Sequence, residues 1–207
     1  MGRSLRPLTL WLVRHGQSTA NAGQPADDYS ESALTELGHQ QARRAAARIA
    51  RPPDLLVVSP MRRAGQTADA IQARRPGVTR QVWPIGEFTY LSPVRCAGTT
   101  VAERRGWVAA YWEQCDPNSV DGGGAESFAA FIERVRAFHD RVLALGSGFV
   151  VAVGHGQFFH AYTLGLERGF AATGQAMRDF RRAEVAGPLG NGEIVEIPLG
   201  LSSRTGG

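Results

Sequence analysis

Two histidines of this chain stand directly after apolar runs of strand type, in positions where they could act on a phosphate ester. Arg14-His15-Gly16 follows one run, and Gly154-His155-Gly156 follows another. A neutral imidazole, with a reference pKa of about 6.5, can attack phosphorus without the repulsion that a phosphate dianion exerts on an anionic nucleophile. The attack forms a phosphohistidine and divides one difficult displacement into two easier steps. We therefore expect His15 to be a nucleophile.

Phosphoryl oxygens need positively charged donors, and the turns after the apolar runs supply them. Arg14 and an arginine of the Arg62-Arg63 pair would offer forked donors to the equatorial oxygens. Charge-assisted hydrogen bonds of this kind contribute about 1.5–3 kcal/mol each. His155 would add a donor, because a bound dianion favours its charged form. Ser18 and Asn21 could bind the same oxygens, although both residue types also form ordinary turns.

The composition favours one compact domain and narrows the chemistry. The chain has 207 residues, of which 43% are hydrophobic, enough for one full core. Its net charge is +4, but all 23 basic residues are arginines, and their five adjacent pairs are scattered along the chain. Scattered charge is typical of solvated helix faces, so we expect no nucleic-acid partner. Because lysine is absent, a Schiff base and a Walker-type phosphate loop are both excluded.

No pattern in the sequence indicates a metal, an organic cofactor or a membrane segment. Cys96 and Cys115 form no paired motif, and no histidine–carboxylate spacing resembles a metal site. The apolar stretch near the start is broken by Pro7, and no run reaches membrane-spanning length. We therefore expect a cytoplasmic protein that uses no cofactor. The oligomeric state stays open.

Strands and helices alternate along the chain, which predicts an α/β fold. Short apolar runs bounded by polar turns predict strands at 8–13, 55–58, 81–83, 149–153 and 193–198. Apolar residues three and four apart, with capping residues, predict helices at 34–50, 59–74, 101–112 and 126–145 and one after Gly156. We expect a frayed tail at 202–207. Ligands of such sheets bind at the carboxyl ends of the strands, so the histidine turns should converge on one edge.

Five segments, in order, resemble motifs of the histidine phosphatase superfamily, which includes cofactor-dependent phosphoglycerate mutases and many small phosphatases. The segments are Arg14–Asn21, Leu34–Ala42, Ser59–Ala68, Gly124–Ser127 and Val153–Gly156. Gln17, Ser18 and Gly154 depart mildly from the family pattern. The resemblance implies a phosphoglycerate mutase-like, three-layer fold with a mostly parallel sheet and helices on both faces. It also implies a single domain over 1–207, with 88–125 as an excursion over the active site.

The resemblance selects Arg63 rather than Arg62 as the second phosphate-binding arginine, and it places the family's acid at Glu87. An alkoxide is a poor leaving group, so a carboxylic acid with a raised pKa must protonate it. The same carboxylate could then activate water against the phosphohistidine. Three weaker candidates for the acid are Glu36, Glu103 and Glu126. No role is assigned to the histidines within predicted helices, which are His39, His139 and His160.

These observations together predict a phosphomonoesterase that hydrolyses a small phosphorylated substrate through His15. The predicted catalytic residues are Arg14, His15, Arg63, Glu87 and His155, without a metal. Two alternatives stay open, a mutase that returns the phosphoryl group to a bound acid and a module that only binds a phospholigand. The substrate is not predicted, because it depends on 89–124. There an anion could meet Arg95, Arg104 or Arg105, and a ring could pack on Tyr90, Trp107 or Trp112.

Overall fold

The computed structural model describes residues 6–24 and 28–199. Their elements are, in chain order, β1 (Leu8–Arg14), η1 (Tyr29–Glu31), α1 (Glu36–Arg48), β2 (Leu55–Val58), α2 (Arg62–Arg74), β3 (Arg80–Val82), α3 (Pro93–Cys96), α4 (Arg105–Gln114), α5 (Phe128–Leu143), β4 (Gly148–Gly154), α6 (Gly156–Arg168), α7 (Gly174–Ala186) and β5 (Ile194–Leu199). The tail expected at 202–207 lies outside the described residues.

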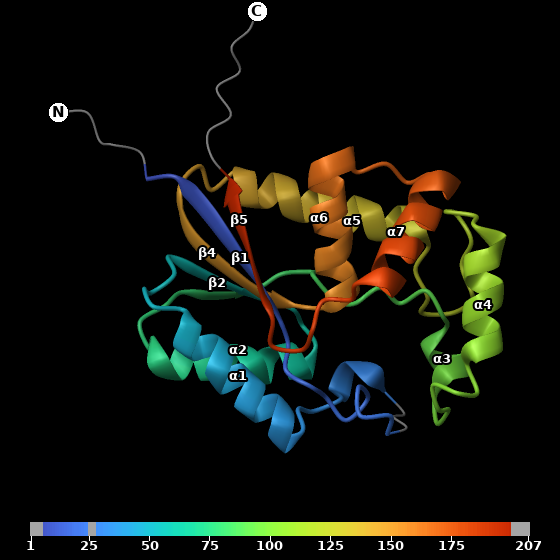
Figure 1. Ribbon diagram of the computed structural model, residues 1–207, viewed down its shortest axis with the longest axis horizontal. Coiled ribbons are helices and arrows are strands. Elements are labelled where there is room, and N and C mark those ends of the chain that lie inside the picture. Colours follow the sequence, from blue (N-terminus) through green and yellow to red (C-terminus); the bar gives the residue numbers. More distant parts are fainter. Residues whose placement is uncertain (1–5, 25–27, 200–207) are drawn as a thin grey trace, which may run out of the picture.

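The described strands form one sheet in the order β3-β2-β4-β1-β5. Strand β1 pairs in parallel with β4, and β4 with β2, while β5 runs antiparallel to β1. The β5 arrow therefore points opposite to β1 in Figure 1. Because β1, β2 and β4 are parallel, their carboxyl ends meet at one edge of the sheet.

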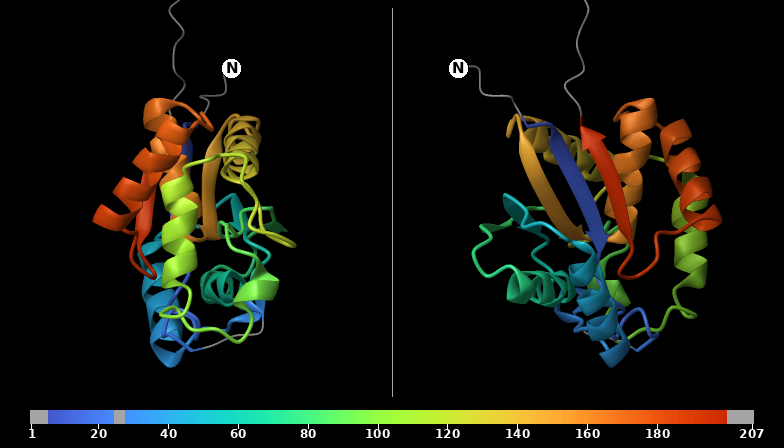
Figure 2. Two further views of the ribbon diagram at one scale, coloured as in Figure 1. Left: turned by 90° about the vertical axis from the view of Figure 1, so that its right-hand side faces the viewer. Right: turned by 60° about the vertical axis from the view of Figure 1, so that its left-hand side comes forward.

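Helices cover both faces of the sheet, so the fold has three layers, as predicted. Alternate residues of each central strand face opposite sides. Leu10, Leu12 and Ala152 belong to a core shared with α5, α6 and α7, whereas Val13 and Val153 belong to a second core shared with α1 and α2. Figures 1 and 2 show α1 and α2 together on one side and α5 and α6 on the other. Because both faces of the sheet are buried, the central strands consist of continuous apolar runs.

The helices that border the site begin at recognisable caps. The side chain of Thr35 accepts a hydrogen bond from the backbone N–H of Gly38 at the start of α1. Ser127 caps α5 in the same way, and Thr173 caps α7. Such caps satisfy backbone donors that the first helical turn leaves unpaired, and each is worth about 1 kcal/mol. A capping residue at the start of the helix predicted at 34–50 is therefore confirmed, and it is Thr35.

The segment 88–125 packs through aromatic side chains against α5 and α7. Phe88 stacks on Phe131 of α5 with ring centroids 4.3 Å apart, and Trp112 stacks on Phe180 of α7 at 5.8 Å. Helix α4 lies beside α7 in Figure 1. Trp112 and Tyr111 are buried there, so the contacts of this segment are mainly those of a core. Whether the segment also covers the site stays a prediction.

Most elements lie where the sequence predicts them. The helix predicted at 101–112 begins later and forms α4, Arg105–Gln114. The short elements η1 and α3 and the helix α7 were not predicted. In α7 only Met177 and Phe180 are buried, so the helix offers few apolar residues as a signal. Its absence from the prediction matters, since α7 and the loop after it contribute to the site.

Candidate active site

Three parallel strands deliver the predicted residues to one edge of the sheet. In the register, Arg14 of β1 lies opposite Gly154 of β4, and Val153 of β4 lies opposite Val58 of β2. The next residue of each strand therefore begins a turn at the same level. The backbone N–H of His15 donates to Gly154 O (2.9 Å), and that of Ser59 donates to Val153 O (3.0 Å). Two of the predicted residues, His15 and His155, thus lie side by side, with ring centroids 5.0 Å apart.

The hydrogen bonds of His15 define its tautomer. Nδ1 lies 2.6 Å from Gly16 O, a carbonyl that can only accept, so Nδ1 carries the proton. Nε2 accepts from Nε of Arg63 at 3.0 Å and therefore holds a lone pair. Burial first, and then the charge of the nearby Arg63, lowers the pKa of His15 from 6.5 to about 3, so the ring is neutral. A neutral ring with an unprotonated Nε2 is the form that can attack phosphorus.

His155 carries its proton on the opposite nitrogen. Its Nδ1 accepts from Nη2 of Arg63 at 3.3 Å, and this leaves the proton on Nε2, which donates to Ser59 Oγ at 2.7 Å. Burial first, and then the charge of Arg63, lowers the pKa of His155 well below its usual value. Ser59 is buried as well. The serine thereby fixes the ring so that Nδ1 faces the guanidinium.

Arg63 lies at the centre of the cluster, on the first turn of α2. It is 7% exposed, while His15 and His155 are 1% and 0% exposed. Burial lowers the pKa of its guanidinium below the ordinary value for arginine. Its guanidinium contacts both imidazoles, which are weak, uncharged acceptors. An oxyanion would be a stronger acceptor for the same donors, so this cluster is suited to bind one.

Arg14 reaches the same region from the end of β1. Nη1 donates to the carbonyl of Leu189, and Nε is buried with no hydrogen-bond partner among the described residues. A Cβ atom at Gly156 would lie 3.2 Å from Nε, so the absence of a side chain there makes room for the guanidinium. Burial lowers the pKa of Arg14, while the carboxylates of Glu87 and Glu184 oppose this. A buried donor without a partner is costly and is expected where a ligand supplies the acceptor.

Glu87 follows β3 and lies beside the start of α6. Its Oε1 accepts from the backbone N–H of Gln157 at 3.1 Å. Burial raises the pKa of Glu87, and the charges of Arg63 and Arg14 oppose that rise. A raised pKa favours the protonated form of the carboxyl. Glu87 can therefore either donate or accept a proton at this site.

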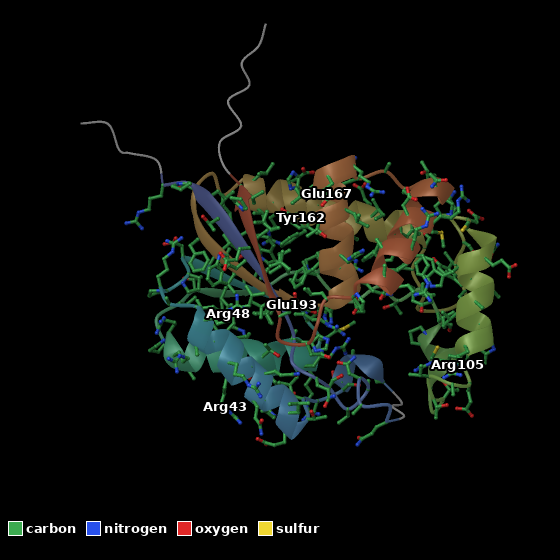
Figure 3. The ribbon with its side chains drawn as sticks, viewed as in Figure 1. Arg43, Arg48, Arg105, Tyr162, Glu167 and Glu193 are labelled. Atoms are coloured by element: carbon green, nitrogen blue, oxygen red, sulfur yellow. The ribbon has the colours of Figure 1, made fainter. Side chains whose placement is uncertain are left out.

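Ser18 and Asn21 contact each other. Ser18 Oγ donates to Asn21 Oδ1 at 3.1 Å, and Ser18 itself is buried. Asn191, from the loop between α7 and β5, donates from Nδ2 to His15 O at 3.0 Å and to Asn21 Oδ1 at 3.3 Å. Glu193, labelled in Figure 3, lies in the same loop, and its carbonyl accepts from the backbone N–H of Arg14. This loop therefore holds the turn that carries His15 from outside.

The turn after His15 lies directly on the first turn of α1. A Cβ atom at Gly16 would be 2.2 Å from Gly38 O, and one at Gly38 would be 2.0 Å from Gln17 O. Only glycine permits such an approach of two backbones. In addition, Gly16 N donates to Thr67 Oγ1 of α2 at 3.1 Å. Contacts with both helices thus fix the turn.

A cavity of about 130 Å³ adjoins the cluster. Its lining residues are Arg14, Glu87, Gly156, Gln157, His160, Glu184, Pro188 and Leu189. Burial lowers the pKa of His160, and His160 Nε2 has no hydrogen-bond partner in the described part of the chain. Glu184 pairs with Arg181 at 3.0 Å. His160 and Glu184 therefore join Arg14 and Glu87 around one space.

The structure brings together five predicted residues and adds others that the sequence did not indicate. Arg14, His15, Arg63, Glu87 and His155 all lie at the carboxyl edge of the sheet. Four further residues had been given no role, and they are Ser59, His160, Glu184 and Asn191. Ser59 directly follows a predicted strand and begins one of the five family-like segments, so its place at this edge was indicated, whereas its contact with His155 was not. His160 and Glu184 carry no such signal, since each lies within a helix.

The three weaker candidates for the acid are engaged in other contacts, and so is Arg95, which was considered for binding an anion. Glu126 pairs with Arg134 and Glu36 with Arg43, while Glu103 contacts Thr100. Arg95 is engaged by Asp121 and lies over the Trp107 ring. In Figure 3, Arg43 and Arg48 lie on α1 and Arg105 on α4.

Two further searches of the described residues gave negative results. In 6–24 and 28–199, no three or more His, Cys, Asp or Glu side chains gather in a way that could hold a metal ion. None of the described helices is long and apolar enough to cross a membrane.

Comparisons with known proteins identify the family. A mycobacterial glucosyl-3-phosphoglycerate phosphatase solved with VO3 is 26% identical, with a TM-score of 0.70 over 91% of this chain and 90% of that one. Two structures show the fold alone. The phosphoserine phosphatase of Entamoeba histolytica, in complex with 3-phosphoglyceric acid, is 21% identical with a TM-score of 0.70 (91% and 89% covered). The alpha-ribazole phosphatase of Shigella flexneri is 20% identical with a TM-score of 0.68 (91% and 89% covered).

A search of curated proteins found no match. The family model of the histidine phosphatase superfamily (branch 1) matches residues 10–185, which is most of the chain. The chain therefore belongs to the histidine phosphatase superfamily.

Proposed function

We propose that the protein is a phosphomonoesterase that hydrolyses a small phosphate ester through a phosphohistidine on His15. Family membership and the phosphatases among the structural neighbours support a phosphatase or phosphoryl-transfer activity. The observation that carries the finer proposal is the tautomer of His15. Gly16 O holds the Nδ1 proton, so the lone pair of Nε2 points to Arg63, the group best suited to hold a phosphoryl oxygen.

In the first step, an ester dianion replaces the imidazoles as acceptor for the guanidinium of Arg63. Arg14 Nε supplies another donor. His155 takes up a proton as the dianion approaches, because opposite charge raises its pKa from the lowered value of the free site. Nε2 of His15 then attacks phosphorus as the bond from phosphorus to the ester oxygen breaks. Glu87, protonated beforehand, gives its proton to that oxygen, and the alcohol leaves.

In the second step, the phosphoryl group passes to water. Glu87 is now a carboxylate and can accept a proton from a water molecule that enters in place of the alcohol. The water oxygen bonds to phosphorus, and the bond between phosphorus and Nε2 breaks. The products are inorganic phosphate and free His15, with Glu87 protonated again. The positive donors of Arg14 and Arg63 stabilise the charge that spreads over the equatorial oxygens in both steps.

The decisive experiment is to trap the phosphoenzyme. Rapid quenching of a reaction with a labelled phosphate ester should yield an adduct that survives base and is lost in acid. His15→Ala should lose both the adduct and the turnover, whereas His139→Ala, which replaces a histidine of α5 in contact with Tyr162, should retain both. An adduct that persists in His15→Ala would place the nucleophile elsewhere. Measuring phosphate release and transfer to an added alcohol in the same samples separates a hydrolase from a mutase.

A further inference from the structure

The cavity beside Glu87 has an outer wall that the proposed mechanism does not use. Arg14 and Glu87 form the wall nearest the phosphate cluster, and His160, Glu184 and Leu189 lie among the residues on the other side. If the proposed function holds, Glu87 donates its proton to the ester oxygen. The carbon side of that ester bond must then face the cavity. The cavity is therefore the place of the leaving alcohol.

The outer wall offers one buried polar atom without a partner and one carboxylate. His160 Nε2 is buried without a hydrogen bond among the described residues. Glu184 lines the cavity and accepts from Arg181 through Oε2. A buried polar atom such as His160 Nε2 is normally satisfied, and a ligand hydroxyl can do so. A hydroxyl can donate to the carboxylate oxygen, and a second one can bind the imidazole nitrogen.

The charged side chain that lines this wall is the carboxylate of Glu184. Burial lowers the pKa of His160, so its ring is uncharged near neutral pH, and the wall's charge comes from Glu184. After burial, which has the largest effect, Glu184 helps to raise the pKa of Glu87, so its field reaches the acid. Arg14 is committed to the phosphoryl group, and Arg181 is already paired with Glu184. A carboxylate on the leaving alcohol would therefore meet a like charge without a free described cation on this wall to offset it.

We propose that His160 and Glu184 form the subsite for the leaving alcohol and that this subsite selects phosphate esters of small, uncharged polyols over phosphorylated carboxylic acids. The cavity of about 130 Å³ has room for an alcohol of few atoms. It equals roughly four times the volume of about 30 Å³ that a water molecule occupies in the liquid. A three-carbon polyol matches this volume.

Glycerol 3-phosphate and 3-phosphoglycerate test the proposal, because they differ chiefly by a CH₂OH group in place of a carboxylate. The wild-type protein should show a kcat/KM for glycerol 3-phosphate at least about tenfold higher, the effect of roughly 1.4 kcal/mol of charge repulsion. Glu184→Gln should bring the two values within about threefold of each other. Equal values in the wild type, a preference for 3-phosphoglycerate, or an unchanged ratio in Glu184→Gln would each overturn the proposal.

Two control variants separate the charge of Glu184 from other effects. Glu133→Gln makes the same change on the exposed face of α5, where Glu133 pairs only with Arg136, and should leave the ratio unchanged. Arg181→Gln removes the cation that pairs with Glu184 and should widen the preference for glycerol 3-phosphate. A ratio that shifts equally in Glu133→Gln and Glu184→Gln would contradict the subsite.

His160 is tested through binding. His160→Leu should raise the KM for glycerol 3-phosphate about fivefold while the inhibition constant of inorganic phosphate stays within about twofold, because phosphate does not reach the outer wall. Equal changes in both constants would overturn a role for His160 in the subsite.

Failure of the proposed function would look different. In that case the wild type would not hydrolyse p-nitrophenyl phosphate or form a phosphoenzyme. The preference for the uncharged polyol can then still be measured by titrating both esters into His15→Ala by calorimetry. If His15→Ala bound 3-phosphoglycerate more tightly than glycerol 3-phosphate, the proposed subsite would be overturned independently of turnover.

Discussion

The two ends of the active site are built in different ways. At the phosphate end, Arg63, His15 and His155 are almost completely buried, and both imidazoles are joined to the arginine. At the proposed alcohol end, His160 and Glu184 are only partly buried, and His160 Nε2 has no partner among the described residues. The phosphate end is prepared for a group that every phosphate monoester shares. The alcohol end, built from α6, α7 and a loop, is where members of one family can differ.

The largest effect is expected where the two ends meet, at Glu87. Glu87→Gln removes the acid, so hydrolysis of glycerol 3-phosphate should slow by about 10²–10⁴-fold. With p-nitrophenyl phosphate, a burst of p-nitrophenolate release precedes dephosphorylation. The rate of this burst should change far less, because p-nitrophenolate leaves without a proton. Steady-state and burst rates of both esters check this, with Glu103→Gln on an exposed segment as the control. Equal burst rates for glycerol 3-phosphate in Glu87→Gln and the parent would remove Glu87 from the acid role.

The buried histidines of the phosphate end should make the fold sensitive to acid. The pKa of His15 is lowered to about 3, and that of His155 is lowered well below 6.5. In the unfolded chain these rings take up protons below a pH of about 6.5, whereas in the folded protein they stay neutral there. The free energy of unfolding should therefore fall as the pH falls through 6.5, by about 2 kcal/mol per histidine at pH 5.

Urea unfolding between pH 7.5 and 5 measures this loss. Near pH 5, His15→Asn and His155→Asn should each reduce the slope of the free energy of unfolding against pH. The reduction should correspond to the uptake of about one proton. A slope identical to that of the wild type in both variants would show that these rings are not neutral in the folded state.

The smallest effect is expected at Asn191. This residue lies in the loop between α7 and β5 and contacts the turn that carries His15. Asn191→Ala removes the hydrogen bonds to His15 O and Asn21 Oδ1. We expect kcat to fall about tenfold and the free energy of unfolding to fall by about 1 kcal/mol. Asn118→Ala, at an exposed turn before α5, is the control and should change neither. An unchanged kcat with the same loss of stability would reduce Asn191 to a structural residue.

The difference between the two ends also explains what the sequence could reveal. The runs 8–13, 55–58 and 149–153 predict strands because they are buried on both faces, and a polar turn after a buried strand points to the sheet edge. The phosphate end could therefore be predicted from its turns. Glu184 lies on a helix whose sparse apolar residues gave no signal, and Asn191 lies in a Gly-rich loop typical of an ordinary turn. Their positions depend on packing between distant segments.

Strand β1 obtains both of its neighbours from much later parts of the chain. Leu8 pairs with Gly148 on one side, and Val13 pairs with Ile194 on the other. During synthesis on the ribosome, the segment that carries His15 consequently emerges long before anything that can hold it in place. Activity should therefore first appear in nascent chains from which the 187–199 segment has emerged from the ribosome.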